Sequence, residues 1–107
     1  MKNQLVENNS NTKLLVSLVN SAITQTEGVI LDDYKPLQKI LNNAGIYVYA
    51  EDINNVVIDV HVNIVYGYDI SKVACDLQER IINMVTESTK MKIKKINVIV
   101  DNVVFNK

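Results

Sequence analysis

The sequence predicts a two-layer sandwich of the α/β (α+β) class, with a mixed sheet of about four strands and two main helices on one face. Two patterns support this prediction. From Val56 to Tyr66 apolar and polar residues alternate, as they do in a strand with one buried face. From Ile70 to Val85 apolar residues recur at helical spacing. The order of elements along the chain provides too few helices to cover both faces of a sheet.

The first element expected is a helix that begins at Asn11. Apolar residues recur there every three or four positions, and Ser10 or Asn11 can accept hydrogen bonds from the free N–H groups of the first turn. We expect Gly28 to end this helix, because glycine adopts the left-handed conformation that closes a helix. A short apolar strand should follow over Val29–Leu31.

The middle of the chain should form an antiparallel hairpin. Residues 46–50 alternate between small or apolar residues and tyrosines, and a turn-rich stretch follows at 51–55. This strand should therefore pair with the long strand that begins at Val56. For residues 35–43, a short helix with Pro36 in its first turn and a partly ordered loop fit equally well.

The second main helix should be capped by Asp69, whose carboxylate suits the positive end of the helix dipole. The last strand is expected over Ile96–Phe105, and if it lies parallel to the long strand, the connection between them should be a right-handed crossover. One of its faces carries only aliphatic residues, namely Ile96, Val98, Val100 and Val104. Its other face is mixed and carries Asn97, Ile99, Asp101, Val103 and Phe105. A mixed face on a terminal strand suggests that a tail, a second subunit or a partner covers it.

Composition limits the function classes. With 48% hydrophobic and 21% charged residues, the chain is expected to form one globular domain over residues 11–107, preceded by a flexible tail at 1–10. No signal peptide opens the chain and no apolar run is long enough to insert into a membrane, so we expect a cytoplasmic protein. One cysteine and one histidine cannot build a structural zinc site, and Cys75 is expected to be buried or half-buried.

His61 is the sharpest candidate for chemistry. It shares a strand face with Asp59 and Asn63, and a carboxylate beside an imidazole is one arrangement used for acid–base work. A solvated sheet face explains the same pattern better, because no nucleophile or second histidine is fixed nearby. We therefore predict no catalytic residue, no metal site and no cofactor.

Nucleic acid is the main rival ligand, because small α/β sheets often bind RNA. The net charge is -1, and the three glycines form no phosphate-binding loop. A small basic cluster does occur at Lys90, Lys92, Lys94 and Lys95. A solvated helix end explains this cluster better than a phosphate site does. We expect nucleic-acid binding to be weak or absent.

The central and final segments resemble the alkaline-shock-protein family of Gram-positive bacteria, also called the envelope stress response family. The resemblance rests on the valine-rich strand ending in Tyr66-Gly67, on the helix pattern that follows, and on the terminal strand 96–100. The helix pattern comprises Ile70, Val73, Ala74, Gln78, Glu79 and Ile81. Upstream, Thr26-Glu27-Gly28-Val29 is similar to the family's junction after the first helix. Ser71 departs from the proline of many relatives, and Lys90 departs from their usual glycine.

The resemblance implies a non-enzymatic cytoplasmic protein that binds other proteins in envelope or general stress homeostasis. Its partner would be a protein, and a small membrane-anchored protein would hold it near the membrane; a homo-oligomer is also implied. Two alternatives remain open, a regulatory partner of a lipid-synthesis enzyme and a weak nucleic-acid-binding module. The interaction surface would lie on the strand residues and outer helix residues Asp59, His61, Asn63, Gln78, Glu79 and Arg80.

Overall fold

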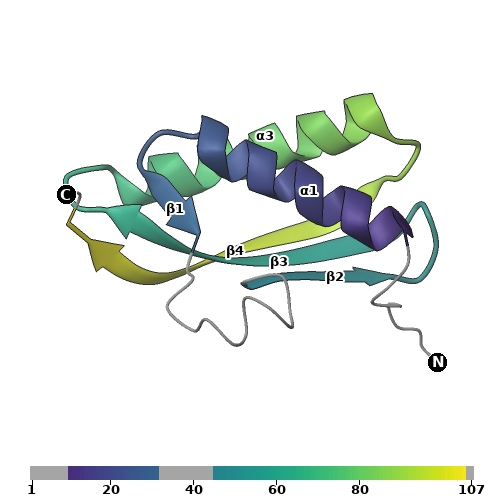
Figure 1. Cartoon of the computed structure of the whole chain (residues 1–107), viewed down its shortest axis with the longest axis horizontal. Coiled ribbons are helices and arrows are strands. Elements are labelled where there is room, and N and C mark those ends of the chain that lie inside the picture. The colour runs from purple at the N-terminus through teal and green to yellow at the C-terminus, as the bar shows by residue number, and fades with distance from the viewer. Residues whose placement is uncertain (1–9, 32–44, 106–107) are drawn as a thin grey trace.

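A computed structural model describes residues 10–31 and 45–105, which form two layers (Figure 1). One layer is a four-stranded sheet, and both helices lie on the same side of it. The elements follow the chain as α1 (Ser10–Gln25), β1 (Val29–Leu31), β2 (Ile46–Ala50), β3 (Val56–Val65), α3 (Ile70–Ser88) and β4 (Ile93–Val104). The predicted fold class is confirmed. The helix or loop predicted at 35–43 and residues 1–9 of the predicted tail lie outside the described residues.

β3 is the central strand of the sheet. β4 runs parallel to it along one edge, from Val56 paired with Ile93 to Val65 paired with Val104. β1 and β2 both run antiparallel to β3 along its other edge, where they pair with residues 62–64 and 56–60. The sheet is therefore mixed, and the predicted hairpin between β2 and β3 is confirmed.

The core lies between β3 and the two helices. Every second residue of β3 is fully buried, as the alternation predicts, and these residues are Val56, Ile58, Val60, Val62 and Ile64. α3 buries residues at steps of four onto this surface, namely Val73, Leu77, Ile81 and Val85. α1 adds Leu15, Val19, Ala22 and Ile23. Burial of these aliphatic side chains is the main force that holds the helices on the sheet.

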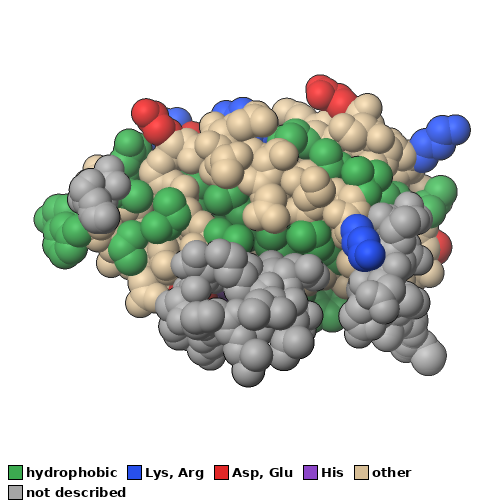
Figure 2. All heavy atoms as spheres, viewed as in Figure 1, with side chains coloured by type: hydrophobic (Ala, Val, Ile, Leu, Met, Phe, Trp, Pro, Cys, Tyr) green, Lys and Arg blue, Asp and Glu red, His purple; other side chains and the backbone are tan. Residues whose placement is uncertain are grey.

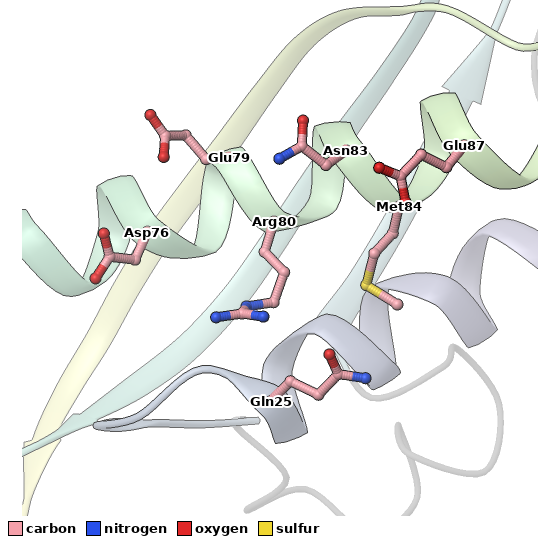
Figure 3. A pocket seen from close by; sticks show the side chains of 7 residues that line it. All are labelled: Gln25, Asp76, Glu79, Arg80, Asn83, Met84 and Glu87. Atoms are coloured by element: carbon pink, nitrogen blue, oxygen red, sulfur yellow. The ribbon is translucent and has the colours of Figure 1, made fainter.

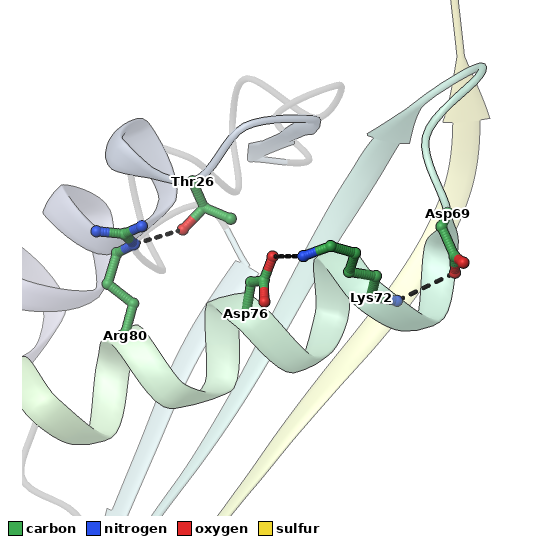
Figure 4. Close-up of polar contacts among 5 residues, drawn as sticks. All are labelled: Thr26, Asp69, Lys72, Asp76 and Arg80. Carbon is green, nitrogen blue, oxygen red and sulfur yellow. Dashed lines mark hydrogen bonds and ion pairs between the residues drawn. The ribbon is translucent and has the colours of Figure 1, made fainter.

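Both helices differ from the prediction at their ends. α1 begins at Ser10, one residue early, and it ends at Gln25, well before Gly28. Gly28 instead turns the chain into β1 with a φ of 88°. α3 has the predicted cap, because Asp69 Oδ1 accepts a hydrogen bond from the Lys72 N–H at 3.1 Å (Figure 4).

Two further corrections concern exposure. Tyr66 was predicted on the buried face, but β3 ends at Val65 and the Tyr66 side chain is 65% exposed. Cys75 was predicted to be buried or half-buried, and it is exposed. It lies two residues from both Val73 and Leu77, which places it about half a helical turn away from the buried stripe.

β4 departs furthest from the prediction. It begins at Ile93 rather than Ile96, and its pairing with β3 shifts twice, so that Lys94 and Asp101 are extra residues without an opposite partner. An extra residue reverses the side to which the following residues point. Val103 therefore pairs with Ile64 of the core face, and Val104 pairs with Val65 of the other face. The predicted face assignment is correct up to Asp101, which reaches His61 on the second face, and it is wrong for Val103 and Val104.

Candidate functional site

The second face of the sheet carries a group of polar side chains, and no described helix or strand packs on it. We call this group the polar face; it consists of Tyr47, Asp59, His61, Asn63, Asn97 and Asp101. Strand register places these residues in neighbouring rows. Tyr47, Asp59 and Asn97 form one row across β2, β3 and β4, and His61 with Ile99 forms the next. Five residues of the polar face are half-buried and Asp101 is exposed.

His61 binds Asp101 rather than its strand neighbour Asp59. The His61 Nδ1 lies 3.1 Å from Asp101 Oδ2 and 3.2 Å from Oδ1. Asp101 is the extra residue of the second register shift in β4, so the irregular backbone brings its carboxylate to the imidazole. The imidazole and the Tyr47 ring also make a T-shaped contact, with centroids 5.8 Å apart and planes at 84°. The ring is therefore held from two sides.

Asp59 has a different partner from the one the sequence suggested. Its Oδ1 accepts a hydrogen bond of 2.7 Å from Asn97 Nδ2, directly across the β3–β4 pair. The sequence identified Asp59, His61 and Asn63, and it placed Asn97 and Asp101 on a mixed face without linking them to His61. Only the strand register brings these residues together with Tyr47.

Asn63 stands apart within the polar face. Its Oδ1 is buried and accepts no hydrogen bond from the described residues. A buried acceptor without a donor costs about 1–3 kcal/mol of folding free energy. Sheet stability therefore does not explain why asparagine stands at this position.

We expect Asn63→Val to raise the free energy of unfolding by about 0.5–2 kcal/mol, because it removes the unsatisfied acceptor and places a β-branched residue in a strand. Urea denaturation followed by circular dichroism measures the change. Asn97→Val is the matched comparison, since it removes a satisfied amide and should destabilise the chain by leaving Asp59 without its donor. A loss of stability in Asn63→Val would contradict this account.

The three helix residues predicted at the surface have different surroundings. Gln78 is half-buried, and its Nε2 donates a hydrogen bond of 3.1 Å to the Ile96 carbonyl of β4. Arg80 is half-buried and donates from Nε to Thr26 Oγ1 at 3.1 Å. Of the three, Glu79 alone is exposed. Gln78 therefore connects α3 to β4, and Arg80 connects α3 to the residue that follows α1.

Arg80 joins the two helices where α1 ends. Thr26 is buried and its Oγ1 accepts the hydrogen bond from Arg80 (Figure 4). The same Oγ1 donates to the Ala22 carbonyl at 2.7 Å. The guanidinium thus lies near the negative end of the α1 dipole, where a positive charge is stabilising. This contact fixes the distance between the two helices at that end.

A shallow groove of about 520 Å³ lies along this junction (Figure 3). Its lining is strongly polar and consists of Gln25, Asp76, Glu79, Arg80, Asn83, Met84 and Glu87. Asp76 also binds the Lys72 ammonium at 3.0 Å, and this carboxylate raises the pKa of Lys72 above its usual value of 10.5. Both groups are largely solvated, so the pair adds little to stability.

Exposed apolar side chains gather at the end of the molecule where β3 and β4 finish (Figure 2). Tyr66 and Phe105 are 65% and 77% exposed, and their ring centroids are 5.0 Å apart. Tyr68 and Ile70 add further exposed apolar surface beside them. Exposed aromatic groups of this kind are enriched at protein–protein interfaces.

Among residues 10–31 and 45–105, no group of three or more His, Cys, Asp or Glu side chains is placed to hold a metal ion. The lysines at 90, 92, 94 and 95 are exposed, and Lys95 lies in one row with Val57 and Tyr49 on the second sheet face. Two strand spacings separate Tyr49 from Lys95, or about 10 Å. That nucleic-acid binding is weak or absent remains a prediction.

Two distant pieces of the sequence pattern meet in the structure. The Gly28 carbonyl accepts a hydrogen bond of 2.8 Å from Val65 N–H, just before Tyr66-Gly67. The Tyr68 ring lies so close to Gly28 that an added Cβ would be 2.7 Å from it. The glycine segment after α1 and the Tyr-Gly turn after β3 are thus in direct contact. This contact explains why glycine is required at Gly28.

A comparison with protein families agrees with this pattern. The model of the alkaline shock protein 23 family, described by a cell envelope-related function, matches residues 1–105. The chain belongs to this family. No match was found to a curated protein or to a solved structure. Neither described helix combines the length and the apolar character that crossing a bilayer requires.

Proposed function

We propose that this alkaline shock protein is a non-enzymatic cytoplasmic protein that binds a protein partner in cell-envelope or general stress homeostasis. The polar face would be the binding surface. The observation that carries the proposal is that six polar and aromatic side chains lie together across three strands, with no described element packed on them.

The arrangement of these side chains supports binding better than turnover. His61 and Asp59 are each held by a partner on another strand, so their orientation is fixed before any ligand arrives. Fixed side chains lose little conformational entropy on binding, which favours affinity.

A small membrane-anchored protein is the partner that fits the family description of a cell envelope-related function. Such a partner would hold the chain near the membrane, since neither described helix can do so by crossing it. A lipid-synthesis enzyme regulated by binding is the alternative partner, and it needs the same kind of surface.

Affinity capture from detergent-solubilised cells of the native bacterium tests the proposal. The wild-type chain should retain a membrane protein, and Tyr47→Ala/His61→Ala should retain roughly tenfold less, because loss of one central aromatic anchor costs about 1–2 kcal/mol of binding. Asn83→Ala/Glu87→Ala is the matched control on the helix layer and should retain as much as wild type.

Three results are informative beyond the expected one. Capture of a soluble lipid-synthesis enzyme instead would favour the regulatory alternative. Capture of RNA alone, released by added salt, would overturn protein binding in favour of nucleic acid. Equal capture by both double variants would exclude the polar face as the binding surface.

A further inference from the structure

In the part of the chain that the structure describes, the outer edge of β4 is the longest strand edge that pairs with no other strand. β4 has twelve residues and pairs only with β3 there. Such an edge presents unpaired N–H and C=O groups to any strand that approaches.

Three hydrogen bonds show which way the backbone of this region points. Val56 N–H donates to the Lys92 carbonyl and Tyr66 N–H donates to the Val104 carbonyl, so the N–H groups of even-numbered β3 residues point to β4. The Ile96 carbonyl instead accepts from Gln78 of α3. In the regular segment between the two register shifts, Val98 and Val100 have the same orientation as Ile96, because backbone groups alternate along a strand. Their N–H and C=O groups face outward.

We propose that two copies of this chain dimerise by antiparallel pairing of β4 with β4, centred on Val98, so that one sheet continues through both copies. The sequence of the segment is complementary to its own reverse. With Val98 opposite its symmetry mate, Ile96 faces Val100, Asn97 faces Ile99, and Lys95 faces Asp101 of the partner subunit. Two-fold symmetry forms the Lys95 pair twice.

The orientations agree with this pairing. Lys95 pairs with Val57 and Asp101 binds His61, so both lie on the second sheet face and would meet across the dimer. Lys95 is exposed and makes no ion pair with a described residue. The Asp101 carboxylate can accept a hydrogen bond from a lysine without losing its contact to His61, because each oxygen has two lone pairs. For the same reason the Ile96 carbonyl can accept a backbone N–H in addition to the Gln78 amide.

The helix above this edge supports the same partner. The charged residues of α3 are Lys72, Asp76, Glu79, Arg80 and Glu87. Four of them line the groove on the α1 side, and Lys72 binds Asp76 (Figure 3). The opposite flank, which contacts β4 through Gln78, carries no charge and consists of Ser71, Ala74, Cys75, Gln78, Ile82 and Thr86.

Antiparallel pairing at the edge places the helices of both copies on one side of the continuous sheet, so the two uncharged flanks would face each other. The symmetry axis passes between the two copies of Val98. Val98 lies two residues further along β4 than Ile96, which Gln78 contacts. Two strand residues span about 6.6 Å, which corresponds to roughly four residues of α3. The axis therefore passes close to Ala74 and Cys75, where small side chains allow close approach.

Sedimentation equilibrium of the full chain tests the dimer. Wild type should be a dimer that dissociates on dilution. Val98→Pro removes an outward N–H while leaving the β3–β4 hydrogen bonds intact, and it should be a folded monomer. Val98→Ala keeps this N–H and should still dimerise. A wild-type monomer at every concentration, or a dimer that survives Val98→Pro, would overturn the proposal.

Charge reversal provides a test that does not depend on proline being tolerated. Lys95→Asp and Asp101→Lys should each weaken the dimer roughly tenfold, because each replaces two attractive pairs with two repulsive ones. Combining both substitutions should restore the dissociation constant to within about threefold of wild type. Failure of the combination to restore the dimer would exclude this register.

Cys75 supplies a distance check, since it is the sole cysteine of the chain. A short bis-maleimide should link two wild-type copies and should not link Val98→Pro. Rapid linkage in the proline variant would place the contact elsewhere. The dimer shares Asp101 with the polar face, but partner capture is tested at Tyr47 and His61 and the dimer at Val98, so either proposal can fail while the other holds.

Discussion

Leu77→Ala should lower the free energy of unfolding by about 2–5 kcal/mol. Leu77 is fully buried at the middle of α3, between the turns that carry Val73 and Ile81, and it packs into the core above β3. Removing its side chain forfeits the transfer free energy of three carbons and leaves a cavity that a helix held at both ends cannot close. Because a domain of this size has roughly 5–15 kcal/mol of stability, this single change removes a large part of it.

Urea denaturation gives the value for Leu77→Ala. Ile70→Ala is the matched control, because it removes an isomeric side chain from the same helix at a position that is 44% exposed. We expect this control to cost less than about 1 kcal/mol. Equal costs at the two positions would show that α3 is not packed on the sheet through the stripe Val73, Leu77, Ile81 and Val85.

The second large effect is expected at Gly28. Gly28→Ala places a Cβ at a φ of 88°, and this Cβ would lie 2.7 Å from the Tyr68 ring. The left-handed backbone costs about 1–2 kcal/mol for alanine, and the steric overlap adds about 1–3 kcal/mol. The substitution should also weaken the contact between the α1–β1 junction and the turn after β3, since the Gly28 carbonyl bonds to Val65.

Gly67→Ala separates the two contributions. Gly67 has a φ of 102°, but an added Cβ would have no neighbour within 4 Å, so only the backbone cost remains. Calorimetry should show the larger loss for Gly28→Ala, and Tyr68→Ala in the same chain should recover the difference. An additive double variant would mean that the Tyr68 ring does not explain the requirement for glycine.

Much of the fold could be predicted because two strong periodicities adjoin in the centre of the chain. The alternation over Val56–Ile64 identified the buried face of β3, and the repeat from Val73 to Val85 identified the buried stripe of α3. Asp69 could be recognised as a cap because its chemistry is local. Each of these inferences needs only residues that are near in sequence.

The errors arise where distant residues decide the outcome. The extra residues Lys94 and Asp101 have no local sequence signature, so neither the start of β4 nor the reversal of its faces could be predicted. The pairing of His61 with Asp101 depends on this register, and alternation along β3 alone suggested Asp59 instead.

Helical periodicity has a similar limit. It placed Gln78 and Arg80 outside the buried stripe, which is correct for their angular position. It could not show that α1 lies along one flank of α3 and the edge of β4 along the other. For the same reason, periodicity alone could not show that the charged residues of α3 lie toward α1 or beside the groove.

The central claim is that the second sheet face binds a protein of the cell envelope, and site-specific photo-cross-linking in living cells tests it most directly. A photoreactive residue at Val57 lies on the central strand of this face, in the row between Tyr49 and Lys95. The same residue at Asn83 lies on the helix layer. The account predicts a cross-linked adduct with a protein of the membrane fraction from Val57 and none from Asn83. Equal adducts from both positions, or an adduct from Val57 to RNA alone, would contradict it.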